Sequence, residues 1–240
     1  MERLDKIIAL GAGISRADAR RRILKGEVCL DGSPVRDIAR RLDPAAASIT
    51  LAGQRIDYRE HLYIMMNKPK GVLSATEDPT RKTVLDLLPD SLRRRGLFPV
   101  GRLDRDTTGL LLITDDGNFA HMLLSPSKRV PKQYIAGLDA DIDGAVVDGF
   151  AKGLTLADGT RLAPAKLEPL DHNATVLVTV TEGKYHQIKR MFGLFGIGVV
   201  SLKRISFAGL RLPEDLAEGM VRELSLQEYQ QIIDTKIRAK

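Results

Sequence analysis

The spacing of apolar residues predicts two short helices at the start of the chain. Leu4, Ile7 and Ile8 recur at helical spacing, and two glycines follow them. Ser15 then begins a Ser-x-x-Asp capping box, which is typical of a helix N-terminus. Gly26 supplies the stop signal of this second helix.

The pattern next indicates short strands and a boundary between two domains. Val28–Leu30 and Val35 flank an Asp-Gly-Ser-Pro hairpin signal, and Ile49–Leu51 adds one more short strand. The stretch that follows is polar and of mixed charge, which is typical of a linker. We therefore expect an N-terminal domain over residues 1–57, a linker at 58–62 and a second domain over 63–240.

The second domain contains clear strand and helix patterns. Tyr63–Met66 predicts a short strand, and Leu110–Ile113, bounded by glycines, predicts a buried one. Alternating apolar residues at 167, 176, 178 and 180 indicate antiparallel pairing. Helices are expected over Asn118–Leu124, at Ile188–Phe195 and from Leu226 onward.

Composition narrows the functional classes. The chain has 37 basic and 31 acidic residues, a net charge of +6 that favours a polyanionic partner. A single cysteine, Cys29, excludes an internal disulfide framework and favours a reducing, cytoplasmic compartment. No apolar run is long enough to span a membrane, and the acid-containing start is not typical of a secretory signal.

The second predicted helix is strongly basic. Its polar positions are Arg16, Arg20, Arg21, Arg22 and Lys25. Such a run is commonly a solvated face. Here almost all charges have one sign, and like charges repel along a helix unless an anion covers them. These residues are candidate contacts to RNA phosphates.

A charged motif precedes the buried strand at Leu110–Ile113. Asp104 lies at the mouth of this strand, between Arg102 and Arg105. A carboxylate in such a place is either a structural acid paired with arginines or a reactive group tuned by its surroundings. The residues alone leave both alternatives open.

Several kinds of site are not indicated. The four histidines, His61, His121, His172 and His186, are scattered and have no ligand spacing with Cys29, so we expect no metal site. The sequence has no glycine-rich phosphate loop, no dinucleotide fingerprint and no nucleophilic serine elbow. The remaining carboxylate motif and basic clusters suit chemistry on a nucleic acid without an external cofactor.

The N-terminal part resembles the alpha-L RNA-binding domain that small-subunit ribosomal protein four shares with several RNA-modifying enzymes. The resemblance rests on Arg3-Leu4-Asp5-Lys6, Ser15-Arg16, Gly26, Val28 and Asp31-Gly32. The chain departs from the pattern at residues 43–47, where Asp-Pro-Ala-Ala-Ala replaces a Gly-Asp turn.

The second part resembles the rRNA pseudouridine synthases, in the RsuA-type branch that acts on small-subunit 16S rRNA. Four stretches carry the resemblance: Asn67-Lys68-Pro69-x-Gly71, Gly101-Arg102-Leu103-Asp104-x-x-Thr107-x-Gly109-Leu110, Lys132-x-Tyr134, and Glu182-Gly183-x-x-His186-Gln187-Ile188-Lys189-Arg190-Met191. The resemblance implies an α+β catalytic domain with a mixed, largely antiparallel sheet in two lobes and Asp104 in the cleft between them.

The resemblance also implies a site. Asp104 matches the required carboxylate, which must be ionised whether it attacks the sugar or removes a ribose proton. Lys189 matches the basic partner that favours this charge. Tyr134 matches the aromatic that stacks on the target base, and Arg102 matches the arginine that helps hold disrupted RNA.

Further RNA contacts are expected from basic and polar residues in the same motifs. These are Lys68, Lys70, Lys132, His186, Gln187 and Arg190.

The implied reaction is the isomerisation of uridine to pseudouridine in 16S rRNA. It needs no cofactor, because reactant and product are isomers. We expect a monomeric, non-membrane protein whose partner is ribosomal RNA or an assembling ribosomal particle. Two alternatives remain open: the same reaction on 23S rRNA, and a non-catalytic RNA-binding assembly factor.

Overall fold

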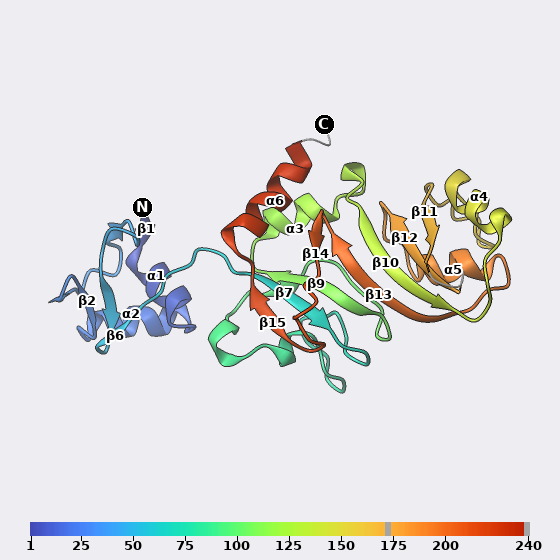
Figure 1. The fold of residues 1–240 in the computed structure, drawn as a ribbon. Helices are drawn as coiled ribbons and strands as arrows, with labels where there is room; N and C mark the ends of the chain where they lie inside the picture. Colours follow the sequence, from blue (N-terminus) through green and yellow to red (C-terminus); the bar gives the residue numbers. More distant parts are fainter. Residues whose placement is uncertain (171–173, 238–240) are drawn as a thin grey trace. The chain divides into compact units, whose positions relative to one another are not determined.

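A computed structural model describes residues 1–170 and 174–237 (Figure 1). The chain forms two compact units. One contains residues 1–62 and 89–97, and the other contains residues 63–88 and the chain from residue 98 onward.

The first unit has the helices and strands that its sequence predicts. Helix α1 spans Leu4–Gly11, and α2 spans Arg16–Leu24, with the Ser15 hydroxyl accepting a hydrogen bond from the backbone N–H of Asp18. Four antiparallel strands form a sheet in the order β3-β2-β5-β6, and a separate pair joins β1 to β4. The strands are β1 (Glu2–Arg3), β2 (Val28–Leu30), β3 (Ser33–Pro34), β4 (Arg41–Leu42), β5 (Ile49–Leu51) and β6 (Gln54–Arg55).

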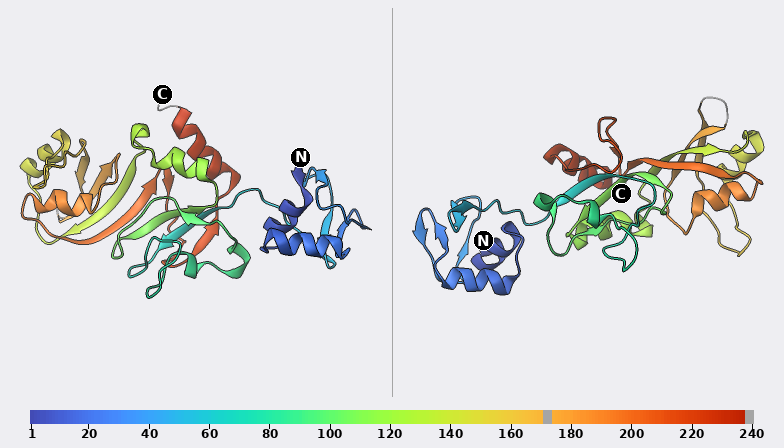
Figure 2. Two further views of the ribbon diagram at one scale, coloured as in Figure 1. Left: turned by 180° about the vertical axis from the view of Figure 1, so that it is seen from behind. Right: turned by 90° about the horizontal axis from the view of Figure 1, so that it is seen from below.

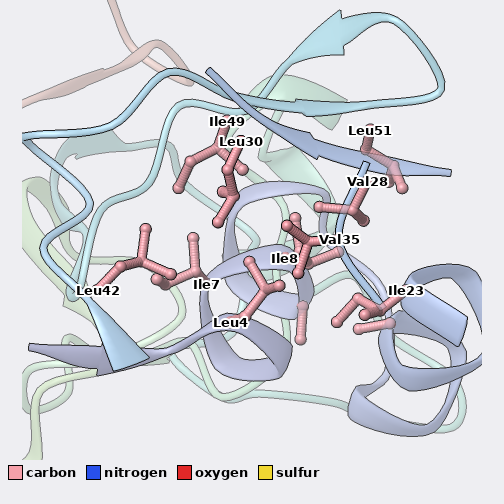
Figure 3. Packing of buried hydrophobic residues seen from close by; sticks show 12 residues of the cluster. Leu4, Ile7, Ile8, Ile23, Val28, Leu30, Val35, Leu42, Ile49 and Leu51 are labelled. Carbon is pink, nitrogen blue, oxygen red and sulfur yellow. The ribbon is translucent and has the colours of Figure 1, made fainter. Parts of the chain in front are cut away.

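The core of this unit lies between the helices and the sheet. Figure 3 shows Leu4, Ile7 and Ile8 of α1 packed with Ile23 of α2 and with side chains from the strands. Residues 89–97, which the sequence assigns to the second domain, pack with this unit. Within it, the Arg94 guanidinium donates to the carbonyl oxygens of residues 59 and 60.

The second unit is built on one mixed sheet. The strand order is β11-β12-β10-β13-β9-β7-β15, with β14 paired to β13 and β8 paired to β9. Among the described strand pairs of this sheet only β9–β13 is parallel, which confirms the expected largely antiparallel sheet. The strands are β7 (Tyr63–Lys68), β8 (Phe98–Pro99), β9 (Thr108–Thr114), β10 (Lys132–Leu138), β11 (Lys166–Pro169), β12 (Thr175–Val180), β13 (Val199–Phe207), β14 (Leu210–Arg211) and β15 (Val221–Glu223).

Helices gather in two groups along this sheet. Figures 1 and 2 show α3 (Gly117–Leu124) and α6 (Leu226–Ile237) together, and α4 (Gly144–Lys152) and α5 (Gln187–Gly193) beside β11 and β12. Phe119 of α3 and Ile232 of α6 share a core with the sheet residues Met65 and Leu110. Short 3-10 turns lie at Leu85–Leu87, at Asp90–Leu92 and at Pro126–Lys128. None of the described helices has the length and apolar character required to cross a membrane.

Helix α4 is an element that the sequence pattern does not reveal. It contains Gly149, a poor helix former. A Cβ atom built on Gly149 would lie 2.6 Å from the Phe195 ring, so tertiary packing accounts for this glycine.

Gly109 brings the central strands close together. Its φ is +100°, and an added Cβ atom would lie 2.2 Å from the carbonyl oxygen of Arg204 on β13. A side chain at this position would therefore push β9 away from β13. The glycine therefore allows the parallel pairing of β9 with β13. This pairing fixes the start of β9, which follows the loop that carries Asp104.

Candidate active site

Asp104 lies on a loop that leads into β9 and is held by backbone hydrogen bonds. The Ser74 hydroxyl accepts from the Leu103 N–H at 3.1 Å and donates to the Leu103 carbonyl at 3.0 Å. The Gly71 N–H donates to the carbonyl of Arg105 at 2.7 Å. The residues on both sides of Asp104 are thus attached to the segment that follows β7.

Lys68, the last residue of β7, binds the same loop through hydrogen bonds from its buried ammonium. Its side chain is completely buried. Its ammonium donates to four carbonyl oxygens, those of Pro69 (3.1 Å), Asp104 (3.1 Å), Arg105 (3.3 Å) and Thr107 (3.0 Å). This corrects the expected RNA contact of Lys68, because a buried and fully engaged ammonium does not reach RNA. Burial lowers the pKa of Lys68 to about 8.

A pocket opens beside the Asp104 carboxylate. Tyr134 on β10 lines it from the sheet and is only 8% exposed. Thr107 also lines it, and its buried hydroxyl has no hydrogen-bond partner among the described residues. Arg102 contributes to the wall and is exposed. The pocket therefore combines a carboxylate, an aromatic ring and a cation, drawn from segments far apart in the sequence.

Lys189 lies between two carboxylates. From the first turn of α5, its ammonium contacts both oxygens of Asp106 at 2.7 Å and lies 3.7 Å from Asp104. This hydrogen bond lowers the pKa of Asp106. The expected neighbour, Asp104, is within reach, but Asp106 is the nearer partner. Asp106 lies two residues after Asp104 in the same motif. This spacing is the one feature of the sequence that indicates a place for Asp106 beside the site.

His186 closes the pocket on the side of α5. Its Nε2 lies 3.6 Å from the Asp104 carboxylate, and its φ of +47° is in the left-handed region. The exposed ring of Tyr185 stacks on the imidazole, with centroids 3.9 Å apart and planes 18° apart. Tyr185 is absent from the motif residues that indicated the site.

The other residues expected to contact RNA have different surroundings. Gln187 is buried, with its amide donating to Glu182 and accepting from the Lys184 N–H, so it already has structural partners. Lys132 is partly buried, and burial lowers its pKa to about 8. Arg190 pairs with Asp158, and Lys70 is exposed.

The arginines of α2 are paired, which corrects the picture of uncovered like charges. Burial alone would raise the pKa of Asp5, but hydrogen bonds from Arg3, Arg20 and Arg16 hold it far below the usual range. Arg21 contacts Asp18, and Arg22 contacts Glu27. Lys25 is exposed.

These arginine side chains stay substantially exposed, from 39% for Arg22 to 66% for Arg21. They can therefore still face an anion.

The described residues contain no group of three His, Cys, Asp or Glu side chains arranged to hold a metal ion. His172, one of the four histidines considered from the sequence, lies outside the described residues. The site contains a partly exposed carboxylate, 27% accessible, beside a cation and an aromatic ring in a pocket. Such a set can hold a planar base and serve as base or nucleophile next to it.

Comparisons with known proteins agree with this geometry. Residues 62–193 match the family described as RNA pseudouridylate synthase, and residues 2–46 match the S4 domain. The chain is 44% identical to the uncharacterized RNA pseudouridine synthase YtzG of Bacillus subtilis (strain 168), over 94% of this chain and 96% of that protein.

A second relative and a solved structure are similar over nearly their whole lengths. Ribosomal small subunit pseudouridine synthase A of Escherichia coli (strain K12) is 39% identical, over 96% of this chain and 100% of that protein. A crystal structure of a pseudouridylate synthase has a TM-score of 0.67 and 32% identity, covering 97% of this chain and 100% of that one.

Proposed function

The chain belongs to the RNA pseudouridylate synthase family and isomerises uridine to pseudouridine in RNA; from this premise we propose that its substrate is 16S ribosomal RNA and that Asp104 is the catalytic carboxylate. The observation that carries the assignment of Asp104 is its position in a pocket with Tyr134, Lys189 and His186. Its loop is fixed by Lys68.

The reaction breaks the bond between uracil N1 and the ribose C1′ and forms a bond from uracil C5 to the same carbon. The proton at C5 is lost and N1 gains one, so atoms balance without a cofactor. Asp104 acts in its charged form, either by attacking the sugar or by removing a ribose proton. Lys189, 3.7 Å away, places a positive charge beside this carboxylate.

The target base must leave its RNA stack to enter the pocket, at a cost of a few kcal/mol. Tyr134 offers its ring to the extruded uracil, since it lines the pocket and is held by β10. Arg102, exposed at the same pocket, is placed to hold the RNA from which the base has been removed. Binding energy from these contacts offsets the unstacking.

The S4 domain supplies a second basic surface for RNA. The α2 side chains Arg16, Arg20, Arg21, Arg22 and Lys25 are the proposed phosphate contacts. Their acidic partners hold them in place, and their exposed guanidinium groups remain available. We propose that the protein works on ribosomal RNA or an assembling particle, as a cytoplasmic monomer.

The choice of small-subunit RNA is supported by the 39% identity to the Escherichia coli protein with that name. It is also supported by the His-Gln-Ile-Lys sequence at residues 186–189, which resembles the form of this motif in the small-subunit branch of the family. The same reaction on 23S rRNA is the nearest alternative. A non-catalytic assembly factor is disfavoured by the presence of Asp104, Tyr134 and Lys189 in one pocket.

The deciding experiment maps pseudouridines in both rRNAs from cells with the gene, without it, and with an Asp104→Asn version. We expect one or more 16S positions to lose the modification in the last two strains. Loss at a 23S position would select the alternative substrate. Full modification by Asp104→Asn would remove Asp104 from the mechanism.

A further inference from the structure

Tyr185 is an exposed aromatic ring at the edge of the active-site pocket. It is 71% exposed and lies on the segment between β12 and α5. A single exposed aromatic residue requires no explanation by itself. Its immediate surroundings, however, connect it to the reacting carboxylate.

The ring stacks on a residue that lines the pocket. Tyr185 stacks on His186 with centroids 3.9 Å apart, and His186 lies 3.6 Å from Asp104. His186 lines the pocket, whereas Tyr185 is not among the lining residues. Carboxylate, imidazole and phenol therefore follow one another from the pocket to solvent.

The backbone holds this ring in a defined place. His186 adopts φ +47° and ψ +34°, a conformation that residues other than glycine seldom take. On either side of the pair, the Lys184 N–H donates to the Gln187 side chain at 3.0 Å, and the Gln187 N–H donates to the Lys184 carbonyl at 3.1 Å. The Gln187 amide is itself fixed to Glu182 at 3.0 Å. The exposed ring is thus preorganised by a strained turn and three hydrogen bonds.

We propose that the Tyr185 ring is a stacking subsite for the base of the nucleotide next to the target uridine. This proposal rests on the proposed role of the Asp104 pocket in receiving that uridine. Extrusion of one base leaves its neighbour without a stacking partner, and aromatic rings commonly replace such partners in RNA-binding proteins. Tyr134 is too buried to serve a second base, whereas Tyr185 lies outside the pocket with most of its surface accessible.

Stacking is tolerant of base identity, because every base has a π face. The subsite therefore contributes affinity for single-stranded or opened RNA and little sequence preference.

The absence of tryptophan from the chain permits a direct binding test. Tyr185→Trp introduces a single indole, whose fluorescence reports a base stacked on it. The two probes are a ten-nucleotide oligouridylate and an abasic ribose–phosphate decamer. Binding of each probe at low salt is measured separately, by the fluorescence anisotropy of a label on one end of the probe. We expect quenching by the oligouridylate and none by the abasic decamer.

A matched control places the indole elsewhere on the same unit. Leu226→Trp labels a side chain that is 88% exposed on α6. Its fluorescence should be unchanged by either probe. If Tyr185→Trp is not quenched when anisotropy shows saturation, the stacking subsite is excluded, whichever rRNA the enzyme modifies.

Kinetics separate stacking from a merely structural contact with His186. With transcribed 16S rRNA, Tyr185→Ala should raise KM by roughly 5- to 150-fold, the equivalent of one lost base–aromatic stack, with kcat nearly unchanged. Tyr185→Phe keeps the ring and should behave as wild type. A lower kcat with an altered pH profile and an unchanged KM would show that Tyr185 only steadies His186, and would overturn the proposal.

A wild type that is inactive on 16S rRNA, both free and in an assembling particle, would count against the proposed substrate alone. The same kinetic comparison would then be made on 23S rRNA. The fluorescence result does not depend on that choice.

Discussion

Replacing Lys68 by methionine tests how the Asp104 loop is held. Methionine keeps an unbranched, buried side chain of similar length and removes the ammonium that serves four carbonyl oxygens. An ammonium has three N–H donors, and a hydrogen bond to a charged group contributes about 1.5–3 kcal/mol. Three such bonds contribute roughly 6 kcal/mol in total.

Burial of the charge offsets part of this gain. The fall in the Lys68 pKa from 10.5 to about 8 corresponds to about 3 kcal/mol, at ~1.4 kcal/mol per pKa unit. The net stabilisation is therefore about 3 kcal/mol. With a urea m-value of about 2–3 kcal/mol/M, Lys68→Met should lower the unfolding midpoint by about 1 M. Displacement of Asp104 should also reduce kcat.

Lys70→Met is the matched control, because Lys70 belongs to the same turn and is exposed. Urea unfolding followed by far-ultraviolet circular dichroism should leave its midpoint unchanged. If both variants unfold like wild type and both only weaken RNA binding, then Lys68 contacts RNA and the anchoring role is wrong.

The pH dependence carries a definite sign. The pKa of Lys68 is lower in the folded state than in the unfolded chain, so the unfolded chain holds its proton to higher pH. Below pH 8 the full cost of burying the charge is present. Between about pH 8 and 10.5 wild type should gain up to about 3 kcal/mol of unfolding free energy relative to Lys68→Met. A constant difference across this window would contradict the shift.

Three further outcomes are expected. Asp104→Asn should fold and bind RNA but form no pseudouridine in a single-turnover assay, whereas Asp106→Asn should keep a measurable rate; equal rates would contradict the assignment of Asp104. Lys189→Met should lower kcat with little change in RNA affinity, and Lys189→Arg should restore most of the rate, since the charge is what is required. Asp5→Asn should cost about 2–3 kcal/mol in thermal unfolding, less than for a fully buried pair because the arginines are half exposed. The folded-state pKa of Asp5 lies below its unfolded value, so its stabilisation is complete above about pH 4 and is lost as pH falls further; an identical acid profile in the variant would refute this.

Much of the fold follows from local patterns. The apolar runs of β7 and β9 and the cap of α2 are strong signals, and the structure has these elements. Helix α4 lacks such a signal, because Gly149 is a poor helix former. A glycine is needed there because a side chain would collide with the Phe195 ring. The packing of residues 89–97 with the first unit has no local signature either, since it depends on contacts across the chain.

The site could be predicted only in part. Motifs indicated Asp104, Tyr134 and Lys189, and the fold brings them to one pocket. Lys68 resembles an exposed turn lysine in sequence, because its four carbonyl partners are defined only by tertiary structure. The same holds for Asp5, because two of its three arginine partners, Arg16 and Arg20, come from a neighbouring helix.

The strand order has a consequence for synthesis of the chain. The strand that follows Asp104 takes its parallel partner from residues 199–207, and the strand that ends at Lys68 takes an outer partner from residues 221–223. The first pairing joins segments separated by about half of the second unit and the second by most of it, and contacts of such long range form slowly. While residues 199–207 of a nascent chain are still inside the ribosome, the sheet beside Asp104 lacks strand β13. The protein therefore completes the sheet beside its reactive centre only after residues 199–207 have been synthesised, on the same kind of particle whose RNA it is proposed to modify.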